Sequence, residues 1–262
     1  MTMTSTSRRS SSSTTTSAPS SPTSSNRLST RDRLPIGARA EVTLPVIELG
    51  GARVRFTGRA EGDLGIDAGA GVDGRRHAIE ATPWSWLRQV HGSTVHRVGR
   101  PGAVRGVEGD ALVGGTGCGA LATFTADCAP VALASPDGVI GVVHAGWRGL
   151  ADGVIERALD EMRSLGASRI VAALGPCIRV GCYEFGADDL ARVAQRVGDQ
   201  VVGRSASGRP ALDLTAGVRA ALTRAGVGNL IDVGWCTACD ERFFSHRARR
   251  EAQRQATVVT WT

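Results

Sequence analysis

Two histidines and one cysteine stand out because their side chains are good ligands for a metal ion. His91 lies in the segment RQVHG, Cys128 in TADC and His144 in VVHAGWRG. Two imidazoles and a thiolate suit Zn²⁺, and a set of three protein ligands leaves one coordination position open. An open position is typical of a catalytic zinc, because water or substrate must reach the metal. The three residues are too far apart for a local zinc finger, so the fold must bring them together.

The segment between Cys128 and His144 predicts a hairpin that brings these two residues close. Two apolar, β-prone runs surround the tetrapeptide SPDG at 135–138, which favours a type I turn closed by a left-handed glycine. Pairing Ser135 with residue 139 puts Pro130 opposite His144, where the hairpin needs no donor from the proline. Cys128 then lies diagonally across from His144, at about 7–8 Å between backbone positions. Because proline cannot donate to a neighbouring strand, we expect an edge or a bulge on its outer side.

The composition is that of a folded domain preceded by a different kind of segment. The chain has 262 residues, 42% of them hydrophobic, which is enough for one large domain or two small ones. Residues 1–36 hold twelve Ser, eight Thr and five Arg but no aromatic residue, so they cannot bury enough apolar surface to fold. We expect a disordered tail over 1–36, either dispensable or the product of a gene start placed too far upstream, and a single catalytic domain over 37–262. An organelle transit peptide is an alternative reading of the tail.

Several locations and function classes are disfavoured by composition. An apolar signal segment is missing, and no apolar run approaches the roughly 18–20 residues of a membrane span, so we expect a cytoplasmic protein without a membrane partner. The net charge is +6, but the five Arg and one Asp of residues 1–36 account for four of those charges. With few aromatic residues and no basic helix face, we expect no nucleic-acid partner. All 31 basic residues are arginine, and the lack of lysine excludes P-loop, pyridoxal and Schiff-base enzymes.

Hydrophobic patterns along the chain predict a mixed α/β or α+β domain. Apolar residues between 150 and 162 recur with the helical period. Further helices are expected near 77–88, 187–198 and 212–225. Strands are expected in a hairpin over 41–56, in the segment after Gly92 through residue 98, and at 110–113, 121–125, 169–174 and 256–261.

Segments in order from about residue 50 to the C-terminus resemble the laccase-domain family, also called multicopper polyphenol oxidoreductases. They are RQVHG, DALV, TADC, VVHAGWRG, GPCIRVGCYEFG, CT with FFSHR, and the closing QRQATVVTW. The resemblance implies mixed β-sheets packed as a sandwich and flanked by helices. It also implies that His91, Cys128 and His144 are the zinc ligands and the catalytic residues. The chain departs from the family pattern at GIDAGAGVDG (65–74) and at Cys239.

The same resemblance implies an activity on purine nucleosides. The implied reactions are phosphorolysis of adenosine, inosine, guanosine and methylthioadenosine, and deamination of adenosine. The expected partners are therefore purine nucleosides and phosphate, with the protein a monomer or homodimer. A peptidoglycan quality-control role, which the family name peptidoglycan editing factor suggests, stays open as an alternative.

Three further residues are candidates for binding substrate. Arg148 follows a glycine turn at the start of an expected helix, where backbone amides and a guanidinium bind anions such as phosphate. Arg59 is a second candidate for phosphate. Asp127, next to Cys128, contacts substrate or supports the metal ligand in this reading.

Two other chemistries use the same residues. Cys128 as a nucleophile with His144 as its base would make a cysteine hydrolase or deamidase, although this leaves His91 without a role. Blue copper sites usually add an axial methionine to two histidines and a cysteine. The chain has methionine only at 1, 3 and 162 and no H-x-H pair, so copper is disfavoured against zinc.

Cys236 and Cys239 form a C-x-x-C motif. This motif has two functional interpretations: a redox pair, or a structural zinc site that also uses Cys177 and Cys182. A C-x-x-C without a well-spaced second pair is a weak signal. We therefore favour free thiols, as is usual in the cytosol.

Overall fold

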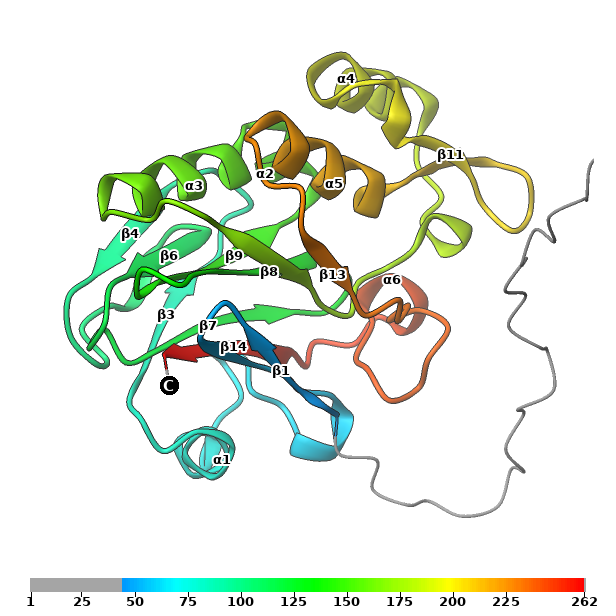
Figure 1. Cartoon of the computed structure of the whole chain (residues 1–262). Coiled ribbons are helices and arrows are strands. Elements are labelled where there is room, and N and C mark those ends of the chain that lie inside the picture. Colours follow the sequence, from blue (N-terminus) through cyan, green and yellow to red (C-terminus); the bar gives the residue numbers. More distant parts are fainter. Residues whose placement is uncertain (1–43, 262) are drawn as a thin grey trace, which may run out of the picture. The chain divides into compact units, whose positions relative to one another are not determined.

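The computed structural model of the chain describes residues 44–261 (Figure 1). The tail expected over 1–36 lies outside these described residues. The described part belongs to one compact unit over 41–262. Among residues 44–261, no helix is both long enough and apolar enough to cross a membrane.

Two six-stranded mixed sheets form the centre of the fold. The first runs in the order β1 (Val46–Leu49), β2 (Ala52–Phe56), β14 (Gln255–Trp261), β7 (Ala120–Thr125), β3 (Trp84–Arg88) and β5 (Arg105–Glu108). The second runs in the order β13 (Leu230–Asp232), β10 (Val171–Leu174), β8 (Ala129–Ser135), β9 (Val139–Ala145), β6 (Ala111–Gly114) and β4 (Val95–Val98). A small third sheet pairs β11 (Val202–Arg204) with β12 (Pro210–Leu212).

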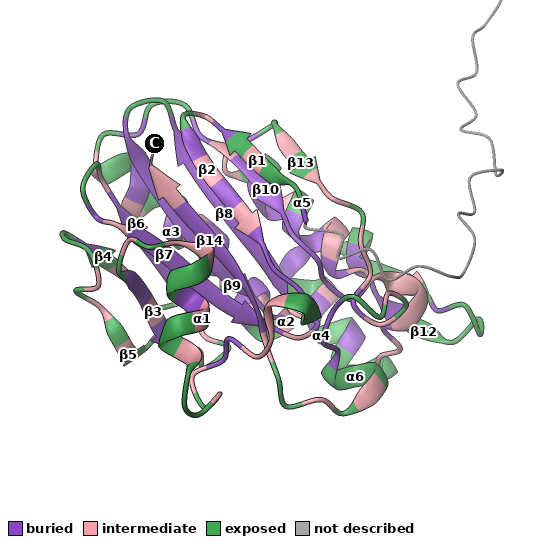
Figure 2. Ribbon diagram, turned by 90° about the horizontal axis from the view of Figure 1, so that it is seen from below, coloured by how far each residue is buried: buried purple, intermediate pink, exposed green. Residues whose placement is uncertain are grey.

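The two large sheets pack against each other, as the resemblance implied. Side chains from both sheets share one buried apolar cluster, with Phe56 and Leu121 from the first sheet and Leu112 and Ile140 from the second. The strands at the centre of both sheets are buried along most of their length (Figure 2). The expected sandwich is therefore confirmed.

Helices cover the outer faces of the sandwich unequally. Three helices lie on the outer side of the second sheet (Figure 1): α2 (Trp147–Ala151), α3 (Val154–Ser164) and α5 (Leu214–Arg224). A fourth helix, α4 (Ala187–Val197), packs on α2 and α5. The first sheet is covered by α1 (Val72–Ile79), whose Ile79 packs on a smaller apolar cluster that includes Trp84 and Phe124. Short helical segments are η1 (Arg59–Glu61), η2 (Val180–Cys182), η3 (Asp199–Val201) and α6 (His246–Arg249).

The hairpin of β8 and β9 has the predicted register. Ser135 pairs with Val139 and Pro130 pairs with His144. Gly138 has φ +87°, and its amide donates to the Ser135 carbonyl at 3.0 Å, which closes the turn. The expectation of an edge or bulge at Pro130 is wrong, because β8 lies inside the sheet. The ladder between β8 and β10 ends at residue 131, so the nitrogen of Pro130 needs no hydrogen to donate. The Pro130 carbonyl accepts from the Gly175 amide at 3.0 Å.

Two expected helices differ from the structure. The helix expected over 77–88 is wrong: α1 ends at Ile79, and Trp84–Arg88 form strand β3. Pro83 disfavours a helix at the preceding residue, and the aromatic residues that follow favour a strand. The helical pattern over 150–162 is divided into α2 and α3 because Gly153 takes a left-handed φ of +80°.

Candidate metal centre

The metal centre forms where the chain crosses from the first sheet to the second. The crossings run from β3 to β4, from β5 to β6 and from β7 to β8. His91 lies in the first crossing, Asp110 in the second and Cys128 in the third. His144 lies in β9, opposite Pro130 at the start of β8. Parallel pairing of β3 with β5 and β7 brings the three crossings to the same end of the sandwich.

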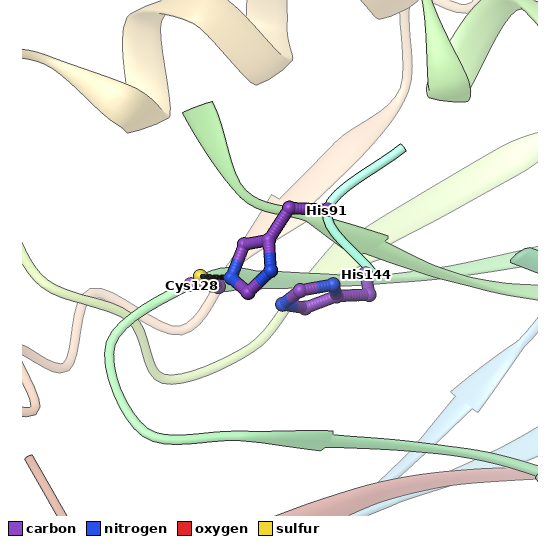
Figure 3. A group of neighbouring side chains, drawn as sticks. All are labelled: His91, Cys128 and His144. Atoms are coloured by element: carbon purple, nitrogen blue, oxygen red, sulfur yellow. Dashed lines mark hydrogen bonds between the residues drawn. The ribbon is translucent and has the colours of Figure 1, made fainter. Parts of the chain in front are cut away.

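The three predicted ligands converge in the structure (Figure 3). One ligand atom from each of His91, Cys128 and His144 lies within 4.8 Å of the other two. The Cys128 Sγ is 3.8 Å from His91 Nε2, and the two imidazole rings meet at 74° with centroids 4.8 Å apart. Ligand atoms around a tetrahedral zinc are separated by roughly 3.5 Å, given bonds of about 2.0–2.3 Å. The three side chains therefore need only small shifts to hold one ion.

Asp110, to which the sequence analysis gave no role, orients His144. Its carboxylate is buried, and Oδ1 lies 2.8 Å from His144 Nδ1. Because a carboxylate only accepts, this contact places a proton on Nδ1 and leaves Nε2 to face Cys128. Burial opposes the charge of Asp110, but hydrogen bonds from His144 and from backbone amides hold its pKa below the ordinary value.

The same carboxylate also fixes the His91 loop. The His91 amide donates to Asp110 Oδ1 at 2.9 Å, and the Gly92 amide donates to Oδ2 at 2.7 Å. His91 adopts a left-handed φ of +61°, which is rare outside glycine and turns the loop around the carboxylate. One buried aspartate thus positions both histidines. The signal in the sequence was an acidic residue directly before the apolar strand ALVG.

Cys128 and His144 form a charged pair when no metal is bound. Burial would raise the pKa of the Cys128 thiol, but the charge and hydrogen bonding of His144 and His91 lower that pKa to about 6. Burial would likewise lower the pKa of His144, but Cys128 and Asp110 raise it to about 9. A thiolate therefore faces an imidazolium near neutral pH. A metal ion can replace that imidazolium proton, because metal ligands must be deprotonated.

Gly146 allows the chain to pass close to the ligands. A Cβ at this position would lie 2.8 Å from His91 Cδ2 and 3.3 Å from Cys128 Sγ. The residue is extended, with φ −72° and ψ 163°, so glycine is required for space rather than for backbone conformation. Its lack of a side chain makes room for the metal ligands.

Aromatic side chains lie beside the metal centre. Trp147 meets Phe185 edge-on at 5.5 Å, and Phe185 meets Tyr183 edge-on at 5.4 Å. Tyr183 is close enough to the thiolate that burial and then the Cys128 charge both raise its pKa. Tyr183 lies in the segment GPCIRVGCYEFG, where no role could be assigned to it from the sequence alone.

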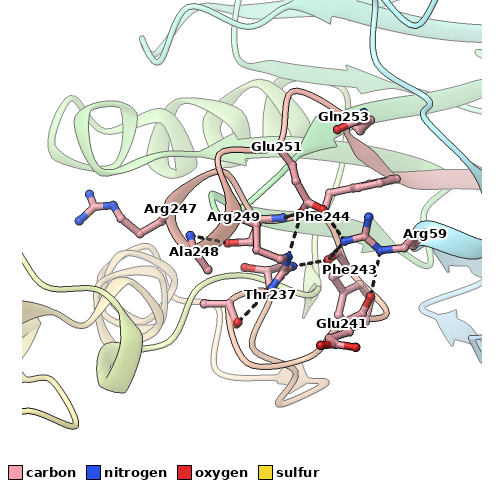
Figure 4. A network of polar contacts seen from close by, with 12 residues as sticks. Arg59, Thr237, Glu241, Phe243, Phe244, Arg247, Ala248, Arg249, Glu251 and Gln253 are labelled. Carbon is pink, nitrogen blue, oxygen red and sulfur yellow. Dashed lines mark hydrogen bonds and ion pairs between the residues drawn. The ribbon is translucent and has the colours of Figure 1, made fainter.

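Of the two candidate phosphate ligands, both exposed, Arg148 has fewer polar contacts within residues 44–261. It is exposed at the start of α2, and its guanidinium lies 5.0 Å from the Trp147 ring centroid. Within residues 44–261 no ion pair of Arg148 is recorded. By contrast, Arg59 donates to Glu241 O at 3.0 Å and forms an ion pair with Glu251 at 2.7 Å (Figure 4). These contacts hold the segment between β13 and β14 (residues 233–254), which we call the C-terminal loop. A role of Arg59 in binding phosphate stays a prediction.

Asp127 likewise supports the C-terminal loop. Its Oδ1 accepts from Thr237 and Ser245 hydroxyls, each at 2.7 Å, and its Oδ2 accepts from the Arg247 amide at 2.6 Å. The residue is buried and has a φ of +107°. These contacts show how the residue before Cys128 is anchored, and a contact between Asp127 and substrate stays a prediction.

Curated relatives resemble most of the chain. A purine nucleoside phosphorylase of Xylella fastidiosa is 43% identical over 185 residues, which cover 66% of this chain and 70% of the relative. One of Streptomyces coelicolor is 39% identical over 207 residues, covering 76% of this chain and 85% of the relative.

The fold also resembles two crystal structures. A Neisseria meningitidis protein aligns with a TM-score of 0.71 and 26% identity, covering 84% of this chain and 99% of that one. YlmD from Geobacillus stearothermophilus aligns with a TM-score of 0.70 and 26% identity, covering 81% and 93%.

The family model described as multi-copper polyphenol oxidoreductase laccase matches residues 72–262. This range contains all three metal-site residues and Asp110. With most of its length matched and its sandwich shared with solved relatives, the chain belongs to the multi-copper polyphenol oxidoreductase laccase family.

Proposed function

We propose that the protein is a zinc-dependent purine nucleoside phosphorylase. The convergence of one donor atom each from His91, Cys128 and His144 carries the proposal. Relatives that are 43% and 39% identical and bear the name purine nucleoside phosphorylase support it. The expected substrates are adenosine, inosine, guanosine and methylthioadenosine, each with phosphate, and adenosine deamination is expected as a second activity.

The donor set fits zinc better than copper. Two imidazoles and one thiolate with an open position are a common catalytic zinc set. A blue copper site would usually add a methionine. Within the described residues the only methionine is Met162, which is buried in the core side of α3. When bound, the zinc would supply a Lewis acid at the open position.

The chain's own residues supply the binding of the two substrates. In phosphorolysis a phosphate oxygen bonds to C1′ of the ribose, and the purine leaves with the electrons of the glycosidic bond. The Arg148 guanidinium is exposed and can hold the phosphate through two parallel hydrogen bonds. The half-buried Trp147 ring suits a purine base, because flat π-systems stack favourably.

The direct test is an assay of the full chain with each nucleoside and inorganic phosphate. We expect free base and ribose 1-phosphate to form together, as measured by chromatography. Arg148→Gln should raise the KM for phosphate several-fold while the zinc content is unchanged. Arg157→Gln, an exposed arginine on α3, is the matched control. A zinc-loaded protein that yields no ribose 1-phosphate from any of the four nucleosides contradicts the proposal.

One observation favours a cysteine hydrolase as a second candidate. Asp110, His144 and Cys128 lie in line, with the carboxylate on Nδ1 and the thiol toward Nε2, as in a catalytic triad. In the metal-free protein the Cys128 thiol would be a thiolate above about pH 6. This candidate gives His91 no role, and that difference separates the two functions experimentally.

A further inference from the structure

A second group of sulfur ligands lies apart from the metal centre. The Sγ atoms of Cys182, Cys236 and Cys239 all lie within 4.8 Å of one another. Those of Cys182 and Cys239 are 2.9 Å apart. Cys182 ends the short helix η2, and the other two lie in the loop after β13. We propose that these three cysteines bind a second zinc ion, which holds the loop over 236–239 in place.

The surroundings of Cys236 fit a thiolate ligand. The Arg179 amide donates to its Sγ at 3.4 Å, and the Cys239 amide donates to the Cys236 carbonyl at 3.2 Å, which closes the turn between the two cysteines. A neutral thiol sulfur is only a weak acceptor, whereas a thiolate accepts an amide hydrogen bond more strongly. The C-x-x-C spacing wraps the backbone around the first sulfur, as it does in structural zinc sites.

Backbone hydrogen bonds fix the cysteine cluster independently of any sulfur contact. Cys236 pairs with Cys177 in an isolated parallel bridge. The Cys177 amide donates to Trp235 O at 3.3 Å, and the Thr237 amide donates to Cys177 O at 3.2 Å. Cys177 itself is buried and does not belong to the sulfur group. The site is therefore built from two thiols in a preformed loop and one thiol at the end of η2, which leaves a fourth position for water.

Two arginines contact the loop that carries the ligands, and each is also paired with a carboxylate: Arg249 with Glu251 at 3.0 Å and Arg179 with Asp232 at 2.6 Å. Three thiolates and one Zn²⁺ carry a net charge of about −1 if all three thiols ionise on binding. The Arg249 guanidinium contacts Ala238 O at 3.2 Å and Thr237 O at 3.0 Å, inside the loop that carries two of the ligands. Arg179 contacts Trp235 O at 3.3 Å on the other side. These arginines therefore hold the loop through its backbone carbonyls, while their own charges are balanced by carboxylates.

A metal at this place would stabilise the first site through one residue. Thr237 lies between the ligands Cys236 and Cys239, and its hydroxyl donates to Asp127 at 2.7 Å. Asp127 directly precedes Cys128. A zinc ion that holds residues 236–239 would thus hold the anchor of the Cys128 backbone, without contacting substrate.

The test is the zinc content of the full chain purified under reducing conditions without chelator, measured by mass spectrometry of the elements. We expect about two zinc ions per chain in the wild type, and about one in Cys239→Ser and in Cys128→Ala. The double variant should retain almost none. Cys118→Ala, which removes a buried cysteine outside both groups, should keep the wild-type zinc content. Because Cys239→Ser and Cys128→Ala report on different sites, failure of one assignment leaves the other testable.

A ligand-rescue variant separates metal binding from general instability. Cys239→His retains a zinc ligand and should recover the ion that Cys239→Ser loses. Full zinc content in Cys239→Ser, or a wild type that loses all its zinc with Cys128→Ala alone, would overturn the second site. A Cys182–Cys239 disulfide found in non-reduced peptides of the freshly purified protein would also overturn it.

Discussion

Asp110 controls the geometry of the metal centre although it is not one of the ligands. It accepts hydrogen bonds from the His144 ring and from the amides of His91 and Gly92. The three ligands could be proposed from the sequence, because histidine and cysteine are common zinc ligands and each lies in a family motif. Asp110 could not, because its role depends on amides that lie 18 and 19 residues away in the chain.

Replacing Asp110 tests this supporting role. Asp110→Asn keeps the shape but removes the charge, and its amide nitrogen cannot accept from the loop amides. We expect zinc affinity to fall by about 10–100-fold, as it does when outer partners of metal ligands are removed. Competition with a chelator measures the affinity. Asp73→Asn, an exposed position on α1, is the control and should not change it. Equal affinity in Asp110→Asn and the wild type would show that the histidines are held by other contacts.

Gly146 makes a second prediction at the scale of single residues. In Gly146→Ala the new methyl would lie 2.8 Å from His91 Cδ2, so the ring must move away from Cys128. We expect reduced zinc content with a melting temperature close to that of the wild type. Gly74→Ala is the matched control, because its Cβ would have no heavy atom within 4 Å. An unchanged zinc content in Gly146→Ala would mean that the His91 loop adapts without loss of the site.

At the scale of elements, local signals predicted the hairpin but not the strand before His91. The 128–144 register follows from a turn whose residue types are specific, and the structure confirms it. Strand β3 is held by parallel pairing with β5 and β7. Such pairing joins separate segments of the chain, so the sequence of β3 itself shows no alternation of apolar and polar residues that would predict a strand. The prediction of an edge or bulge at Pro130 was wrong for a similar reason. Whether the proline needs a donor on the side facing β10 depends on where β10 ends, and other parts of the chain determine that position.

The C-terminal loop is the element that anchors Cys128. It is held by arginines whose donors reach backbone carbonyls, including Arg249 to Phe243 O at 2.6 Å (Figure 4). It is tied to Asp127 by the Thr237 and Ser245 hydroxyls. Neither group of contacts could be predicted from the sequence, because each joins residues more than 100 positions apart or depends on the exact course of the loop.

Removing one hydroxyl from this loop tests the anchor. Thr237→Val preserves the volume but deletes a hydrogen bond to a buried carboxylate. We expect the free energy of unfolding to fall by about 1.5–3 kcal/mol, the range for a hydrogen bond to a charged group. Urea denaturation gives the value, and Thr260→Val on β14 serves as the control. A loss no larger than that of the control would show that Ser245 and Arg247 suffice to hold Asp127.

At the scale of the whole molecule, the two sheets and their crossings determine where chemistry can occur. Three chain crossings at one end of the sandwich supply His91, Asp110 and Cys128, and the adjoining strand supplies His144. The apolar patterns predicted a layered domain, but not which crossings share an end. That depends on strand order, which pairing between distant segments decides.

The boundary of the domain gives a prediction at the same scale. Deleting residues 1–36 should leave the melting temperature, zinc content and phosphorolysis unchanged, because that segment has too little apolar content to contribute to a core. Thermal denaturation and the nucleoside assay of the truncated and full chains measure this. A drop of several degrees after truncation would place part of the tail in the folded domain.

The central claim is that His91, Cys128 and His144 act together through zinc, and His91→Ala tests it most directly. Cys128 and His144 are needed by both the zinc enzyme and the cysteine hydrolase, so only His91 distinguishes them. Zinc content and nucleoside turnover should be measured on the same preparation, with and without chelator. We predict that His91→Ala loses the zinc ion of this site together with the turnover, and keeps only the ion at the cysteine cluster, because removing one of three ligands sharply weakens metal binding. Full turnover in His91→Ala, insensitive to chelator and abolished by alkylation of Cys128, would contradict the zinc mechanism and assign the site to a hydrolase.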